Sequence, residues 1–133
     1  MAAHVKPTAK IMRVEEVFWE QPPGHFDAFS KLLVHPKCSD TRYLDFRLSS
    51  YRPKGYIDVH AHKVTEHAYY FLQGRGIMEI DGERHLVEPH MFVHIPAGVR
   101  HGIFNTGLED LVFVVAGSPP DDTEVKSAGD SNA

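Results

Sequence analysis

The chain has 133 residues, enough for one domain with its own core. Apolar residues make up 42% of it, charged residues 24%, and the formal net charge is −4, a globular balance that argues against a nucleic-acid-binding protein. No stretch approaches the roughly 18 apolar residues of a membrane span, and "MAAHVKPTAK" lacks the apolar core of a signal peptide. The single cysteine, Cys38, fits a reducing compartment. We therefore expect a cytoplasmic protein with no membrane or nucleic-acid partner.

The N-terminal third of the chain gives weak structural signals. We expect residues 1–10 to be a flexible segment, and "IMRVEEVFW" (11–19) to form an extended arm or an edge strand. Apolar side chains in "HFDAFSKLLV" (25–34) have some helical spacing. That stretch is short and follows "QPPG", so it is equally compatible with a turn that leads into a strand.

From residue 41 onward, short apolar segments alternate with turn residues, which indicates β-strands. "RPKG" is expected to end the first strand, and Asp81-Gly82 is a strong hairpin signal. This pattern with almost no helix predicts an all-β barrel or sandwich of jelly-roll type. The polar sequence after Gly117 predicts one domain over 11–118 and a disordered tail over 119–133. The expected strands are 42–51, 56–62, 67–73, 77–80, 84–87, 91–95, 99–104 and 111–117.

Seven of the ten histidines fall between residues 60 and 101, so we look for chemistry there. Side chains at i and i+2 of a strand point to the same face, so His60 and His62 could bind one ion together. In the next strand only one of the neighbours Glu66 and His67 can face the same cavity. The strand register decides which of the two it is.

A third element, "HIPAGVRHGIFN" (94–105), contributes another histidine. Pro96 and Gly98 predict a sharp bend shortly before His101. Asn105 is expected to close a turn through its side chain at the end of this strand.

These residues resemble the two signature motifs of the cupin superfamily. The first motif is a Gly, then His-x-His, three or four residues, Glu, six residues and Gly; here Gly55 precedes His60-Ala-His62 and Gly74 closes it. The second motif ends in Pro-x-Gly, two residues, His, three residues and Asn, and the segment from Pro96 to Asn105 fits every spacing. The resemblance covers residues 43–117 and implies a double-stranded β-helix barrel.

The sequence departs from the cupin pattern at two positions. His90 replaces the glycine that opens the second motif, which suggests a different turn there. Counting back from the closing glycine of the first motif places His67 where cupins usually have Glu, whereas Glu66 fits the spacing from the histidine pair. A one-residue slip would turn the strand's aromatic side chains to the other face, so we favour His67. The chain is thus similar to four-histidine cupins, with predicted ligands His60, His62, His67 and His101 and with Glu66 as the alternative fourth ligand.

Imidazole ligands suit iron, copper, nickel and zinc, and manganese is possible with a carboxylate. We expect one such divalent ion (Fe, Mn, Cu, Ni or Zn), with an open position for a small-molecule substrate. Tyr69 and Glu66 are the candidate catalytic residues for proton transfer, and Arg47 or Arg100 could pair with a substrate carboxylate. The expected pocket wall is Tyr69, Phe71, Ile103 and Phe104, with Phe46, Met78 and Phe92 as further candidates.

Three functions are compatible with such a site. We favour a metal-dependent oxidoreductase of dioxygenase type. The alternatives are a redox-neutral isomerase, lyase or hydrolase, and a non-catalytic small-molecule-binding module. The outer faces of 67–73 and 111–117 also look apolar, so we expect a homodimer that packs sheet on sheet, as similar single-barrel cupins commonly do.

Overall fold

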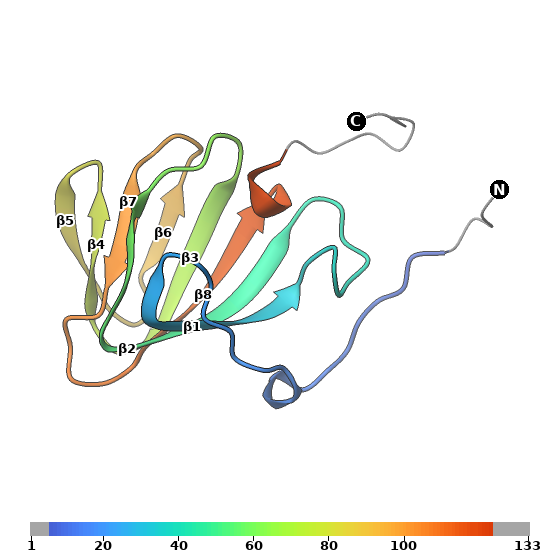
Figure 1. The fold of residues 1–133 in the computed structure, drawn as a ribbon, viewed down its shortest axis with the longest axis horizontal. Helices are drawn as coiled ribbons and strands as arrows, with labels where there is room; N and C mark the ends of the chain where they lie inside the picture. The colour runs from blue at the N-terminus through green and yellow to red at the C-terminus, as the bar shows by residue number, and fades with distance from the viewer. Residues whose placement is uncertain (1–5, 124–133) are drawn as a thin grey trace.

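The computed structural model describes residues 6–123, and its regular structure is almost entirely β-strand (Figure 1). Two short 3-10 helices, η1 (Val14–Glu16) and η2 (Pro120–Asp122), flank the strands. The all-β prediction is therefore confirmed. The strands are β1 (His25–Val34), β2 (Asp45–His60), β3 (Glu66–Gln73), β4 (Gly76–Ile80), β5 (Glu83–Val87), β6 (Phe92–Ile95), β7 (His101–Phe104) and β8 (Leu111–Ser118).

The strands form one curled antiparallel sheet in the order β5-β4-β7-β2-β8-β3-β6, and β1 pairs with the other edge of β2. β2 joins the two halves, because residues 45–51 pair with β8 and the segment from Tyr56 to His60 pairs with β7. We expected "RPKG" to end this strand, and that prediction was wrong. The strand bends there instead, with Lys54 at φ 73, while pairing with β1 continues on both sides of the bend.

The core lies on the concave side of the sheet: every second residue of β8 is buried as far as Gly117, and β3 adds Tyr69 and Phe71 to the same side. Phe71 and Phe113 occupy directly opposed positions and are essentially inaccessible. The opposite face of β3 is only partly covered: Tyr70 is 39% and Leu72 is 43% exposed. The polar end of the concave face, where β2 and β3 meet the loop between them, is where the site lies.

Two segments that the sequence left ambiguous are resolved by pairing. Residues 25–34 form a strand and not a helix, because β2 satisfies their backbone groups along nearly the whole length. Within 11–19, where we expected an extended arm or edge strand, the chain makes the single turn η1, and the following Glu20 bridges to Ser30. The Asp81-Gly82 hairpin is confirmed, with both residues at positive φ (48 and 85).

The prediction of disorder from residue 119 was wrong for its first residues. Pro119 to Thr123 pack against the barrel, and Asp121 accepts a hydrogen bond from His35 Nε2 at 2.8 Å. Polar composition suggested disorder, whereas the two aspartates find partners distant in sequence. The rest of that tail (124–133) and residues 1–5 of the expected flexible segment lie outside the described part of the chain. Across residues 6–123, neither helix is long and apolar enough to cross a membrane.

Candidate metal centre

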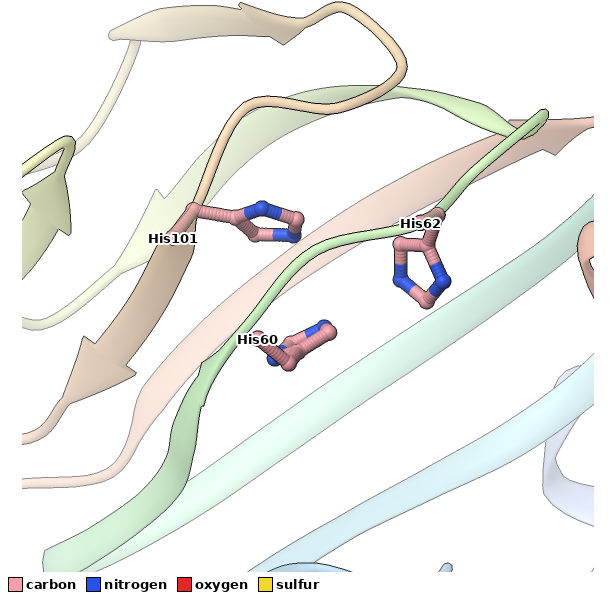
Figure 2. A group of neighbouring side chains, drawn as sticks. All are labelled: His60, His62 and His101. Carbon is pink, nitrogen blue, oxygen red and sulfur yellow. The ribbon is translucent and has the colours of Figure 1, made fainter.

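Three histidines converge at the polar end of the barrel (Figure 2). His60, the last residue of β2, stands directly opposite His101, the first residue of β7, and their ring centroids are 4.5 Å apart. His62 follows two residues after β2, with its ring centroid 4.8 Å from that of His60. One ring nitrogen from each histidine lies within 4.8 Å of the other two, a spacing that allows one ion to be bound by all three.

The prediction that one strand would carry both His60 and His62 was wrong in detail. β2 ends at His60, and His62 lies in the loop from residue 61 to 65. The rings nevertheless converge, because this loop is bound to η2.

Backbone carbonyls set the orientation of two of the rings. His60 Nδ1 lies 2.7 Å from the Asp58 carbonyl oxygen, and His101 Nδ1 lies 2.9 Å from that of Val99. When Nδ1 donates its hydrogen to a carbonyl, Nε2 keeps a lone pair for a ligand. His101 Nε2 is buried and has no hydrogen-bond partner among the described residues, so its lone pair faces the cluster unsatisfied. A divalent metal ion fits this donor set.

Asp122 of η2 holds the loop that carries His62. Its carboxylate accepts hydrogen bonds from the backbone N–H groups of Lys63, Val64 and Thr65 at 3.0, 2.6 and 3.0 Å. These bonds lower the pKa of Asp122 to about 2, so the group stays charged near neutral pH. His62 Nδ1 is 4.0 Å from the same carboxylate, which places a negative charge behind the imidazole.

His67 lies beside the three-histidine group, although its nitrogens are outside that 4.8 Å set. Its ring centroid is 4.7 Å from that of His62 and 6.0 Å from that of His101, and Nδ1 is buried with no partner in the described structure. A Cβ added to Gly117, opposite it on β8, would come within 3.1 Å of His67 Nε2, so this glycine makes room for the ring. His67 as the fourth ligand remains a prediction supported by this proximity.

Glu66, the alternative fourth ligand and a candidate for proton transfer, points to the other side of β3, away from the three-histidine group. Its side chain is exposed and accepts a hydrogen bond from His94 Nε2 at 2.8 Å. The cause is strand alternation: His67 and Tyr69 face the cavity, and Glu66 therefore faces outward.

Tyr69 lies where the sequence analysis placed it. Its side chain lines the cavity, is only 6% exposed, and has its ring centroid 6.2 Å from that of His101. Burial raises the pKa of its hydroxyl well above the usual value, so the group is a neutral hydrogen-bond donor near pH 7.

Burial also keeps the imidazoles neutral. It is the largest of the causes that together lower the pKa of His67 to about 3 and that of His101 to about 4, and the neighbouring histidines contribute to both shifts. The pKa of His62 is lowered for the same reasons. Neutral imidazoles are the form that binds a metal ion, so the site is ready for a ligand without losing protons.

The cavity beside the histidines measures about 120 Å³, which is small for a ligand site. Of the aromatic wall that we predicted, only Tyr69 lines it. Phe71 and Ile103 share the inward faces of Tyr69 and His101 but lie deeper, in the closed core with Met78, whereas Phe92 is 61% exposed. The wall is more polar than expected, and the side chains that the sequence analysis missed are His25, Ser30, Ser49, Tyr51 and Ile57, together with Phe113 and Val115.

Two further residues of the second motif, Asn105 and His90, lie in turns of the structure. Asn105 closes the turn after β7, as predicted: its side chain donates to the Tyr51 and Glu109 carbonyls and accepts from Gly107 N–H. His90 has φ 72, the left-handed conformation that favours glycine, so the turn that we expected to differ keeps a conformation suited to glycine.

The comparisons with known proteins identify the family. A cupin domain model matches residues 47–117, and the chain therefore belongs to the cupin family. An uncharacterized protein of Methanocaldococcus jannaschii, MJ1618, is 36% identical over 70 residues, which is 50% of this chain and 56% of that protein. The chain thus matches little more than half the length of that relative.

Solved structures show the same fold. A predicted oxalate decarboxylase from Thermotoga maritima superposes with a TM-score of 0.74 at 21% identity, covering 82% of this chain and 98% of the other. The polyketide cyclase RemF from Streptomyces resistomycificus gives 0.75 at 22% identity, with 85% and 83% covered. KdgF from Halomonas sp. gives 0.71 at 22% identity, with 86% and 98% covered. Together they confirm the jelly-roll fold of the cupins.

Proposed function

We propose that this cupin binds one divalent transition metal ion through His60, His62 and His101, with His67 as the fourth ligand, and acts as a metal-dependent oxidoreductase of dioxygenase type on a small organic molecule. The observation that carries the proposal is the convergence of three imidazoles. Their Nδ1 atoms lie next to a backbone carbonyl (His60 and His101) or a carboxylate (His62), which leaves Nε2 of each ring for the ion. Iron, manganese, copper, nickel and zinc all suit such ligands.

A bound ion of this kind supplies open coordination positions for a substrate and, if redox-active, for dioxygen. The chain's own residues would do the rest. The small cavity leaves little room for water beside a substrate, and the neutral hydroxyl of Tyr69 would orient the substrate by donating a hydrogen bond. Among the described residues no carboxylate lines the cavity that holds Tyr69, so a carboxylate base is not at hand there, which favours the oxidative function slightly.

The second candidate is a redox-neutral isomerase, lyase or hydrolase. Two similar folds, a predicted oxalate decarboxylase and a polyketide cyclase, bear names of redox-neutral reactions. In that case Tyr69 would move the proton, and the polar wall of the cavity would bind the substrate. A non-catalytic small-molecule-binding cupin is the third.

The test begins with protein purified without added metal. We expect close to one equivalent of a transition metal by elemental analysis, and oxygen uptake when chelating substrates such as diketones or catechols are added. If the metal-loaded protein converts a substrate of this panel without consuming oxygen, the redox-neutral function is favoured. If it neither consumes oxygen nor converts any substrate, the non-catalytic binding module is favoured. Protein without metal after reconstitution with each of the five ions would refute the site itself.

We also propose that the protein is a homodimer. The partly exposed apolar residues Tyr70, Leu72 and Phe92 lie on the outer face of β3 and β6, and sheet-on-sheet packing would cover them. Analytical ultracentrifugation should show twice the 15.0 kDa monomer mass, and a monomer at micromolar concentration would contradict this. The cytoplasmic location stays a proposal too, based on the lone, exposed Cys38.

A further inference from the structure

Arg47 places a positive charge inside the barrel next to the histidines. On β2 it shares the concave face with Asp45, Ser49 and Tyr51, all of them buried. The register puts Arg47 opposite Val115 of β8, which in turn is opposite Tyr69 of β3. Its side chain therefore lies one row deeper in the barrel than that of His67 and lines the same cavity.

The guanidinium has no ionic partner within the described residues. Asp45, Asp121 and Asp122 line a neighbouring cavity together with Arg47, but none of them comes within 4.0 Å of it. Asp121 pairs with His35, and Asp122 accepts three backbone N–H groups, so both are already engaged. Burial raises the pKa of Asp45, and although the Arg47 charge acts to lower it, the two groups form no ion pair within 4.0 Å. A partly buried charge without a partner is costly, which suggests that its partner comes from a ligand.

The surroundings define what such a ligand can be. Ser30 and Ser49 stand opposite each other on β1 and β2 and line the cavity with Arg47, as does Tyr51. The volume of about 120 Å³ has room for a few non-hydrogen atoms beside the histidines. A planar guanidinium forms two parallel hydrogen bonds with a carboxylate.

We propose that Arg47 pairs with the carboxylate of a small 2-hydroxy or 2-oxo acid, whose second oxygen faces His60, His62 and His101. This deepens the proposed function and rests on it for the second oxygen only. Arg100, the other arginine that the sequence suggested, is exposed at the bend before β7 and does not line the cavity.

Calorimetric titration of zinc-loaded protein tests the proposal, because zinc binds without redox turnover. The probes are lactate and lactamide, which have nearly the same shape but differ in charge. We expect lactate to bind at least about 30-fold more tightly than lactamide, as truncation studies of paired charges suggest. Arg47→Met should reduce lactate affinity by a similar factor, while Arg47→Lys should lose less. Arg100→Met, the matched control, should bind lactate as the wild type does.

Four results would overturn the proposal: no measurable lactate binding, equal affinity for lactate and lactamide, unchanged lactate affinity in Arg47→Met, or inorganic phosphate binding more tightly than lactate. Zinc content and thermal midpoint of each variant are measured in parallel, so that loss of the metal or of the fold is recognised. The same titration of metal-free protein separates the two claims. If zinc does not bind while lactate binding still depends on Arg47, the metal site fails and the carboxylate site stands.

Discussion

Acidification from pH 7 to pH 5 should destabilise the metal-free protein through His67 and His101. Burial, followed by neighbouring histidines, lowers the pKa of His67 to about 3, and burial is also the main cause that lowers that of His101 to about 4. In the unfolded chain each imidazole titrates at roughly 6.5. Between these values the unfolded state binds more protons than the folded state, so the free energy of unfolding falls as the pH falls.

The size of the effect follows from the two pKa values. At pH 5 the unfolded imidazole is almost fully protonated and the folded one almost fully neutral. Relative to pH 7, each histidine then lowers the free energy of unfolding by about 2 kcal/mol, or about 4 kcal/mol for the pair. Both folded pKa values lie about one unit or more below pH 5, so both imidazoles stay largely neutral in the folded protein at that pH. A domain with a typical total stability of about 5–15 kcal/mol would lose a large part of it.

Urea unfolding in the presence of a chelator, at pH 7, 6 and 5, measures this directly. The double variant His67→Gln/His101→Gln should lose about 4 kcal/mol less than the wild type over the same range. The exposed histidines serve as the control, since His85→Gln/His90→Gln should follow the wild type closely. A wild-type loss below about 1 kcal/mol, or equal losses in the wild type and the double variant, would refute the burial argument.

Three further predictions concern the loop that carries His62, the ring of His67 and the outer face of β3. Asp122→Ala removes the acceptor of three loop N–H groups; we expect metal affinity to fall about 10–100-fold by competition with a fluorescent chelator, and an unchanged affinity would contradict its role. Gly117→Ala places a Cβ 2.8 Å from Asp45 Oδ1 and 3.1 Å from His67 Nε2; by displacing the imidazole it should weaken metal binding roughly tenfold, whereas Ala116→Val, on the other face of β8, should not. Leu72→Lys, on the outer face of β3, should give monomers in ultracentrifugation with metal content unchanged, and a persistent dimer would exclude that face as the interface.

The local part of this fold was predictable from sequence. Strand alternation and turn residues identified the hairpin at Asp81-Gly82 and the strands around it, because both signals depend on neighbours in the chain. The pair His60 and His101 was found through motif spacing. Their direct opposition in β2 and β7 is a property of the register, which the spacing alone did not define.

Contacts between residues far apart in the chain could not be predicted from the sequence. Asp122 meets the loop after His62 across 57 to 59 residues of chain, within a polar tail whose composition suggested disorder. The choice between Glu66 and His67 needed the register of β3, which shows Glu66 paired with His94 on the outer face. Ser30, which lines the cavity with Arg47, was missed because the signal in residues 25–34 was compatible with a helix as well as with a turn that leads into a strand.

The most direct test of the central claim is the metal stoichiometry of the His60→Ala/His62→Ala variant compared with the wild type. Both proteins are reconstituted with one transition metal and desalted, and their metal content is measured by inductively coupled plasma mass spectrometry, with His85→Ala as the surface control. We predict about one equivalent for the wild type and the control and almost none for the double variant, with circular dichroism showing the same fold in all three. Equal metal content in the folded double variant and the wild type would contradict this prediction.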